Sequence, residues 1–178
     1  MSRRVQKISM DLTPASIDNA IRELREWKDW IEEKTKLLTR ELASVGVQIA
    51  NMRYAQAVYD GDNDVTVTFY QRGENDFAVI AAGRTVFFIE FGTGVRYNAP
   101  HPEANRMGMI RGQYGRGQGS NPKGWYYIGE AGTSGRYVGE RKSGPLYHTY
   151  GNPANQSLWK TRSELIDRFE TIARRVFV

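Results

Sequence analysis

One glutamate and two histidines are the residues of this chain whose types suit acid–base chemistry. Glu90 ends the apolar segment Val86-Phe87-Phe88-Ile89, and such surroundings suit a general acid or base. His101 lies between two prolines, and His148 lies between Tyr147 and Thr149. A hydrolase would use Glu90 together with His101. The sequence favours the alternative, in which Glu90 is a buried residue that fixes the turn Gly92-Thr93-Gly94 by accepting backbone N–H bonds, and both histidines are ordinary loop residues.

Metal and nucleotide sites find no support in the motifs. The two histidines are far apart in the sequence, no Asp-rich motif accompanies them, and the chain has no cysteine. Tyr97 stands where a dinucleotide fingerprint that begins at Gly92 would need its third glycine. The glycine run before Lys123 lacks the Gly-Lys-Ser/Thr ending of a phosphate-binding loop. We therefore expect no catalytic, cofactor-binding or metal-binding residue, no cofactor, and no enzymatic activity.

A basic, glycine-rich tract at residues 92–151 is the segment that indicates partner binding. Of the 18 glycines, 13 fall between Gly92 and Gly144, and the eight basic and three acidic side chains of residues 92–151 give a surplus that equals the net charge of +5. Arginines among aromatics suit phosphate contact and base stacking, and they suit a protein interface equally well. The candidate residues for a DNA channel or a subunit interface are Arg96, Tyr97, Arg106, Arg111, Tyr114, Arg116, Lys123 and Trp125.

A long amphipathic helix is predicted before this tract. Thr13 and Pro14 form a strong helix start, and apolar residues then recur three, four or seven apart as far as Val45. This helix, or a second one after a break at Gly46, continues to Ala55. Trp27 and Trp30 widen the apolar face beyond what one small core needs, and so we expect them at a helix interface with another subunit.

The remaining elements are short strands and a last helix. Residues 65–70 and 77–82 read as two strands joined by a hairpin turn, and 86–91 suits either a short helix or a third strand. Within the basic tract only 125–128 reads as a strand, with 136–138 as its possible partner. Residues 158–176 carry a helical apolar stripe that Asn155 or Ser157 could cap.

Together these elements predict an α+β fold with a long N-terminal helix, a small antiparallel sheet with a long glycine-rich insertion at 92–151, and a C-terminal helix. We find no internal repeat and no linker, which predicts one domain over residues 1–178. The basic start has no apolar run after it, and no stretch approaches the ~20 apolar residues of a membrane span, so no signal peptide and no membrane partner are expected.

The order of the motifs resembles that of the tail-completion (neck) proteins of tailed bacteriophages, the group that includes lambda-like minor tail protein Z. The resemblance runs from about Ile17 to Val178. It is carried by Ile89-Glu90-Phe91-Gly92-Thr93-Gly94, by Pro100-His101-Pro102 and by Gly124-Trp125-Tyr126-Tyr127. Residues 151–158 depart from the Pro-Ala/Ser-x-Pro-Phe segment that many such proteins have before the last helix.

The resemblance implies a structural protein of the virion that assembles in the host cytoplasm. Its subunits would form a ring, a hexamer, at the head-proximal end of the tail, complete the tail and mediate head–tail joining. The implied partners are further copies of the chain, the tail terminator and tail tube, the head–tail connector, and the genomic DNA in the channel. The alternatives are a tail terminator that caps the tube, and a nucleic-acid-binding module that uses the Arg96–Lys123 tract.

Gly92 or Gly94 is expected to take a positive φ in the turn that follows Glu90. Replacing either with valine should then lower stability and block assembly.

Overall fold

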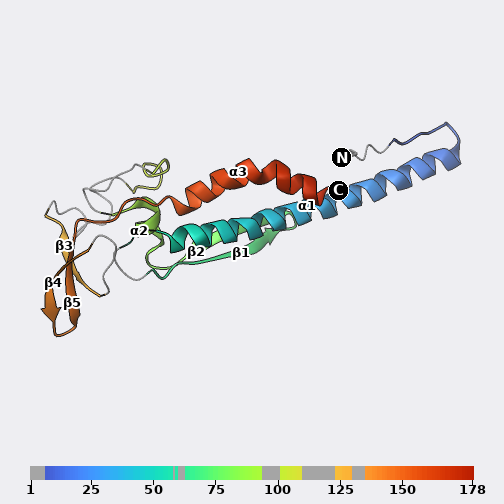
Figure 1. Ribbon diagram of the computed structural model, residues 1–178. Helices are drawn as coiled ribbons and strands as arrows, with labels where there is room; N and C mark the ends of the chain where they lie inside the picture. Colours follow the sequence, from blue (N-terminus) through green and yellow to red (C-terminus); the bar gives the residue numbers. More distant parts are fainter. Residues whose placement is uncertain (1–6, 58, 60–62, 94–100, 110–122, 130–134) are drawn as a thin grey trace.

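The computed structural model describes residues 7–57, 59, 63–93, 101–109, 123–129 and 135–178. Figure 1 shows an elongated molecule with a small sheet at one end and the start of a long helix projecting from the other. The fold is α+β, with a long N-terminal helix, small antiparallel sheets and a C-terminal helix, as the sequence predicts. In chain order the elements are α1 (Pro14–Ala55), β1 (Thr66–Gly73), β2 (Asp76–Ala82), α2 (Val86–Phe91), β3 (Trp125–Ile128), β4 (Arg136–Arg141), β5 (Gly144–Thr149) and α3 (Ser157–Val176).

Helix α1 is a single unbroken helix of 42 residues. Its predicted start is confirmed, because the side chain of Thr13 accepts a hydrogen bond from Ser16 N and Pro14 opens the first turn. Gly46 does not break it. A Cβ at this position would lie 3.1 Å from both Leu165 Cδ1 and Val79 Cγ2, so the missing side chain lets α3 and β2 pack close to α1.

The core lies where the hairpin β1–β2 and helix α2 pack against the C-terminal part of α1. The buried cluster consists of Ala50, Tyr54, Val67, Val86 and Ile89. Residues 86–91, which the sequence left open between helix and strand, form the helix α2. Its buried positions fall three and four apart, at Val86, Ile89 and Glu90, and this is the spacing of one helical face.

The predicted insertion is not all loop. Residues 125–149 hold a second antiparallel sheet in the order β3–β5–β4, separate from the hairpin β1–β2. Strand β5 was not predicted, because its opening Gly144-Pro145 reads as a strand breaker and proline is rare in a central strand. Pro145 is the second residue of β5 and pairs with Glu140, and its carbonyl accepts a hydrogen bond from Gly129 N.

Helix α3 runs antiparallel to the C-terminal part of α1. Arg53 pairs with Glu164 near the start of α3, and Arg175 pairs with Glu41 near its end. Phe177 then meets the edge of Trp30, with ring centroids 5.8 Å apart. The predicted apolar stripe of α3 is wider than the face it buries, since Ile166 and Phe169 are exposed.

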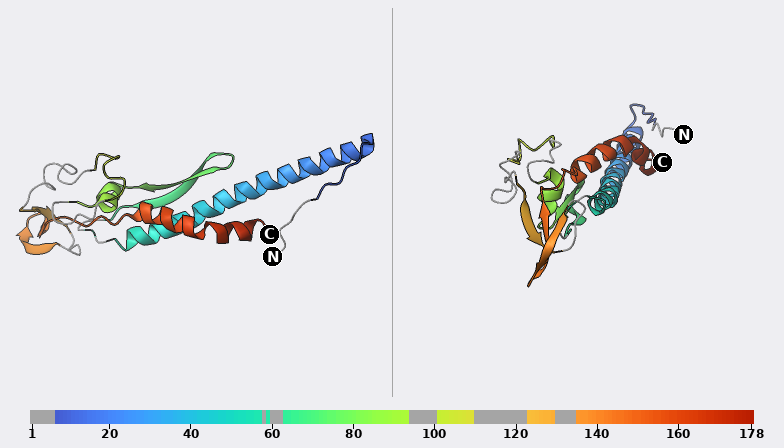
Figure 2. Two further views of the ribbon diagram at one scale, coloured as in Figure 1. Left: turned by 90° about the horizontal axis from the view of Figure 1, so that it is seen from above. Right: turned by 60° about the vertical axis from the view of Figure 1, so that its left-hand side comes forward.

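Helix α1 continues well beyond the end of α3, as Figure 2 shows. We call residues 14–29 the α1 arm. Three of its large apolar residues are exposed, with fractions of 41% for Ile21, 51% for Leu24 and 41% for Trp27, whereas Ala20 beside them is buried.

Candidate functional site

The carboxylate of Glu90 is the centre of a buried polar cluster. Glu90 lies on α2, and only 4% of it is exposed. Its two oxygens together accept four hydrogen bonds, two from side chains and two from backbone amides. Oε2 accepts from Tyr54 Oη at 3.2 Å and Leu158 N at 2.9 Å; Oε1 accepts from His101 Nε2 at 3.1 Å and Trp159 N at 3.1 Å.

Glu90 caps helix α3. The residue before the helix, Gln156, has left-handed backbone angles of 57° and 41° and makes no side-chain cap bond. The first amides of α3 at Leu158 and Trp159 bond to Glu90 instead, where the positive end of the helix dipole also favours a negative charge. The prediction that Asn155 or Ser157 caps this helix is therefore wrong. Glu90 does accept backbone N–H bonds, but these come from α3 and not from the turn at Gly92.

His101 reaches the same carboxylate from a loop. Its Nδ1 accepts a hydrogen bond from Glu103 N at 3.0 Å, which places the ring proton on Nε2, the atom that faces Glu90. The ring is 6% exposed and lies against Phe91, with centroids 4.3 Å apart. The structure thus brings Glu90 and His101 together, as the hydrolase alternative requires, yet both ring nitrogens and both carboxylate oxygens already have protein partners.

Tyr54 completes the cluster from the end of α1. Burial raises the pKa of the Tyr54 phenol, and the negative charge of Glu90 raises it further. The phenol is therefore protonated at neutral pH and donates to Glu90. Tyr54 was not singled out in the sequence, although it lies four residues after Ala50 and so on the buried face of α1.

The turn after Glu90 holds the chain that leads into α3. Gly92 has a φ of 75°, which confirms the predicted positive φ at this turn. A Cβ there would lie 2.6 Å from Ala154 N and 2.8 Å from Asn152 O, so the backbone of this segment packs directly on the glycine. Thr93 and Asn152 exchange two backbone hydrogen bonds of 2.8 and 3.1 Å.

Asn155 links this segment to two helices. Its backbone N–H donates to Ile89 O on α2, and its side-chain amide donates to Arg53 O near the end of α1. Asn152 was not singled out in the sequence, and Asn155 was expected only as a cap of the last helix, because their backbone partners are far away in the chain. We call the residues Tyr54, Glu90, Gly92, His101, Asn152 and Asn155 the Glu90 joint, since they connect the ends of α1 and α2 with the start of α3.

A second carboxylate fixes the other end of α2. Asp64 accepts hydrogen bonds from the Thr85 hydroxyl at 2.6 Å, from Thr85 N and from Arg84 N. These bonds, the one from the Thr85 hydroxyl first, hold the pKa of the Asp64 carboxyl well below its usual range.

A hollow of about 410 Å³ lies beside the Glu90 joint. Aromatic residues on α2 and α3 form much of its lining, including Phe87, Phe91 and Trp159. The guanidinium of Arg162 lies 5.4 Å from the centre of the Trp159 ring, and Arg106 forms an ion pair with Glu103. Glu90 and His101 also line this hollow, but their polar atoms are directed at each other and at the backbone of α3.

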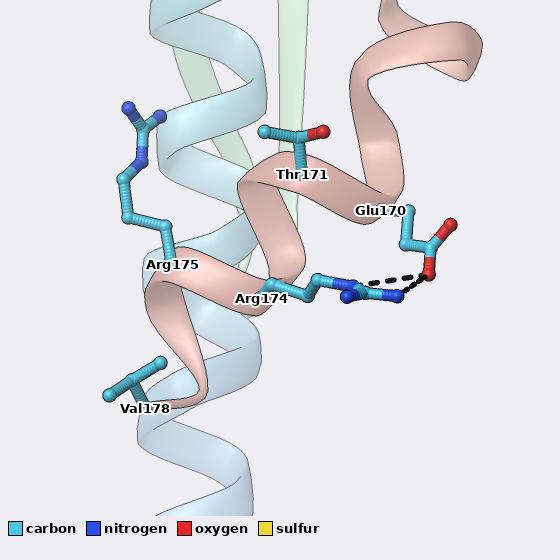
Figure 3. A pocket seen from close by; sticks show the side chains of 5 residues that line it. All are labelled: Glu170, Thr171, Arg174, Arg175 and Val178. Carbon is cyan, nitrogen blue, oxygen red and sulfur yellow. Dashed lines mark hydrogen bonds and ion pairs between the residues drawn. The ribbon is translucent and has the colours of Figure 1, made fainter. Parts of the chain in front are cut away.

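A second hollow lies at the C-terminal end of α3, shown in Figure 3. Arg174 points toward Glu170 on its own helix, and Arg175 bonds to Glu41 on α1 at 2.9 Å. The two guanidinium groups are each neutralised by a glutamate and do not converge on a common point. This hollow therefore lacks the geometry of an anion site.

The candidate residues of the basic tract fall into three places. Arg106 lies at the hollow beside the Glu90 joint, whereas the half-buried Trp125 opens β3 and the exposed Lys123 lies two residues before it. Of the two helix candidates, Trp27 is exposed on the α1 arm, while Trp30 is half-buried and packs on Phe177 of its own chain. Gly94, Arg96, Tyr97, Arg111, Tyr114 and Arg116 lie outside the described residues.

Among the residues that the structure describes, no group of three or more His, Asp or Glu side chains is placed to hold a metal ion. None of the described helices combines the length and the apolar character that crossing a membrane requires. Comparison of the chain with protein-family models, curated proteins and solved structures finds no match.

Proposed function

We propose that this chain is a structural subunit of a bacteriophage tail, a tail-completion (neck) protein that forms a ring at the head-proximal end of the tail and mediates head–tail joining. One observation carries the proposal: two separate strings of the sequence resemblance meet in the Glu90 joint. Glu90 caps α3, Gly92 admits the backbone of 152–154, and His101 of the Pro-His-Pro string donates to Glu90. Proteins that share these two sequence motifs would need both of them, because the motifs bond to each other in this joint.

The state of the acid–base residues supports a structural role. A general acid or base must reach a substrate with at least one free polar atom. In Glu90 and His101, instead, each polar side-chain atom has a hydrogen-bond partner within the protein. These partners include the first amides of α3. Their chemistry therefore serves to hold three helices in place.

The exposed apolar residues support self-assembly. Large apolar side chains are more than 40% exposed at both ends of the long molecule, on the α1 arm and on the sheet β3–β5–β4. Such surfaces on a globular protein indicate interaction sites. A ring built from copies of the chain would cover them.

Light scattering of the purified protein tests the proposal, at low and at high salt and with and without duplex DNA. We expect a closed ring of chains of 20.3 kDa whose mass does not change with salt. A monomer that binds DNA, with a log affinity that falls by about 0.9 per phosphate for each unit of log salt, would favour the nucleic-acid module and refute the ring.

Binding to purified phage tails then separates tail completion from tail termination. A completion ring should bind tails that already carry their terminator and should not bind bare tubes. A ring that binds and caps bare tubes would instead be a terminator.

A further inference from the structure

The α1 arm extends beyond the end of α3 (Figure 2) and keeps large apolar side chains exposed, although Ala20 beside them is buried. Ile17, Ile21 and Leu24 lie at positions four and three apart, and so they share one face of the helix, with Trp27 at its side. The Trp30–Phe177 contact marks the end of the cover that α3 provides. In proteins most of the stability of a helix comes from packing of its apolar face, which is a reason to expect a partner on this face.

The sheet β3–β5–β4 presents a second such surface at the opposite end of the molecule. Its register pairs Tyr126 with His148 and Ile128 with Leu146, so these four side chains share one face, and Arg136 joins them across from His148. Tyr126 is 57% exposed and Ile128 45% exposed. We call these five residues the sheet face. A three-stranded sheet needs a covered apolar face to be stable, and among the described residues no helix packs over this sheet.

The two surfaces carry opposite net charge. The α1 arm, residues 14–29, contains four acidic and three basic side chains, namely Asp18, Glu23, Glu26 and Asp29 against Arg22, Arg25 and Lys28. Residues 123–149 contain four basic and two acidic side chains, namely Lys123, Arg136, Arg141 and Lys142 against Glu130 and Glu140. A helix with a negative net charge and an apolar stripe is thus complementary to a sheet with a positive net charge and an aromatic surface.

We propose that the α1 arm of one copy of this chain packs across the sheet face of the next copy. This contact joins two different surfaces, and a contact of that kind closes into a ring when the rotation per subunit divides a full turn. The alternatives, arm against arm or sheet against sheet, would bring together surfaces whose net charges have the same sign. The inference rests on the proposed ring, and it names the surfaces that make it.

Mixing two variants tests the contact. The arm variant Ile21→Gln with Leu24→Gln removes the apolar stripe and keeps good helix formers. The sheet variant Tyr126→Thr with Ile128→Thr removes the apolar sheet face and keeps strand formers. The control variant is Ile166→Gln with Phe169→Gln, which changes two equally exposed apolar residues on α3.

We expect the wild type and the control to form the same ring and each test variant alone to be a monomer of 20.3 kDa in light scattering. An equimolar mixture of the two test variants should give a heterodimer of twice that mass, because one intact arm and one intact sheet face remain. Circular dichroism and urea unfolding of each monomer check that it is folded.

Other outcomes overturn the inference in separate ways. If the sheet variant alone still forms dimers or rings, its arm does not need the sheet face. If both test variants form the wild-type ring, the ring of the proposed function stands and this contact is wrong. A wild type that stays monomeric would refute both the proposed ring and the contact between the α1 arm and the sheet face.

Discussion

Replacement of Glu90 by glutamine should destabilise the protein by about 1–3 kcal/mol, because the amide cannot accept four hydrogen bonds. Glutamine offers one acceptor oxygen and one NH₂ donor where the carboxylate has two acceptors. If the NH₂ took the Oε1 place, both His101 Nε2 and Trp159 N would face a donor. The less costly choice puts it at Oε2, where the Tyr54 hydroxyl can turn to accept while Leu158 N remains stranded.

The magnitude follows from that one stranded amide. A buried donor without a partner costs about 1–3 kcal/mol, and loss of the negative charge at the start of α3 adds a smaller amount. For a chain of 178 residues this corresponds to a decrease in Tm of about 2–4 °C per kcal/mol. Glu90→Ala should cost more, since it strands every donor of the joint and leaves a cavity.

Urea unfolding followed by circular dichroism measures the change, with Glu103→Gln as the matched control. Glu103→Gln is the same change of residue type in the same region. The carboxylate of Glu103, however, pairs with the exposed Arg106, and such an ion pair contributes at most about 1 kcal/mol. If Glu90→Gln cost no more than Glu103→Gln, the description of Glu90 as the cap of α3 would be refuted.

Two further predictions concern Gly92 and Asp64. Gly92→Ala should cost about 3 kcal/mol and Gly108→Ala about 1 kcal/mol, because both glycines have a positive φ but only at Gly92 would a Cβ meet backbone atoms; equal urea midpoints would contradict this. The lowered pKa of Asp64 means that its stabilising effect is complete above about pH 4 and is lost as the pH falls further. The difference in urea midpoint between wild type and Asp64→Asn should therefore shrink from pH 7 to pH 3, and a constant difference would argue against the bonds to Thr85.

The sequence predicts the elements whose signals are local. The cap at Thr13, the stripe of α1, the alternation in β1, the apolar run of β2 and the helical spacing of α3 are all read within a few residues of one another. The positive φ in the turn after Glu90 is also local, because glycine is the residue type that such a conformation requires. Strand β5 escaped prediction for a local reason as well, since its first two residues are those that usually end strands.

The Glu90 joint could be predicted only in part, because its partners are distant in the chain. A buried glutamate with backbone partners was expected, but the amides it binds are 68 and 69 residues away. They belong to a helix for which Asn155 or Ser157 was expected as the cap. Its third donor, Tyr54, lies 36 residues before it in another helix. No periodicity or spacing rule connects such positions, and only packing of the whole chain brings them together.

The joint also determines how much of α1 stays uncovered. Helix α3 begins where α1 ends and runs back along it, so the overlap cannot exceed the length of the shorter helix. Helix α1 has 42 residues and α3 has 20, and the 16 residues of the α1 arm, beyond the Trp30–Phe177 contact, correspond to about 24 Å at 1.5 Å per residue. A variant of the joint should therefore lose stability and assembly together, because it releases α3. A variant of the α1 arm should lose assembly alone, and this difference separates the surface that binds the next copy from the residues that hold the fold.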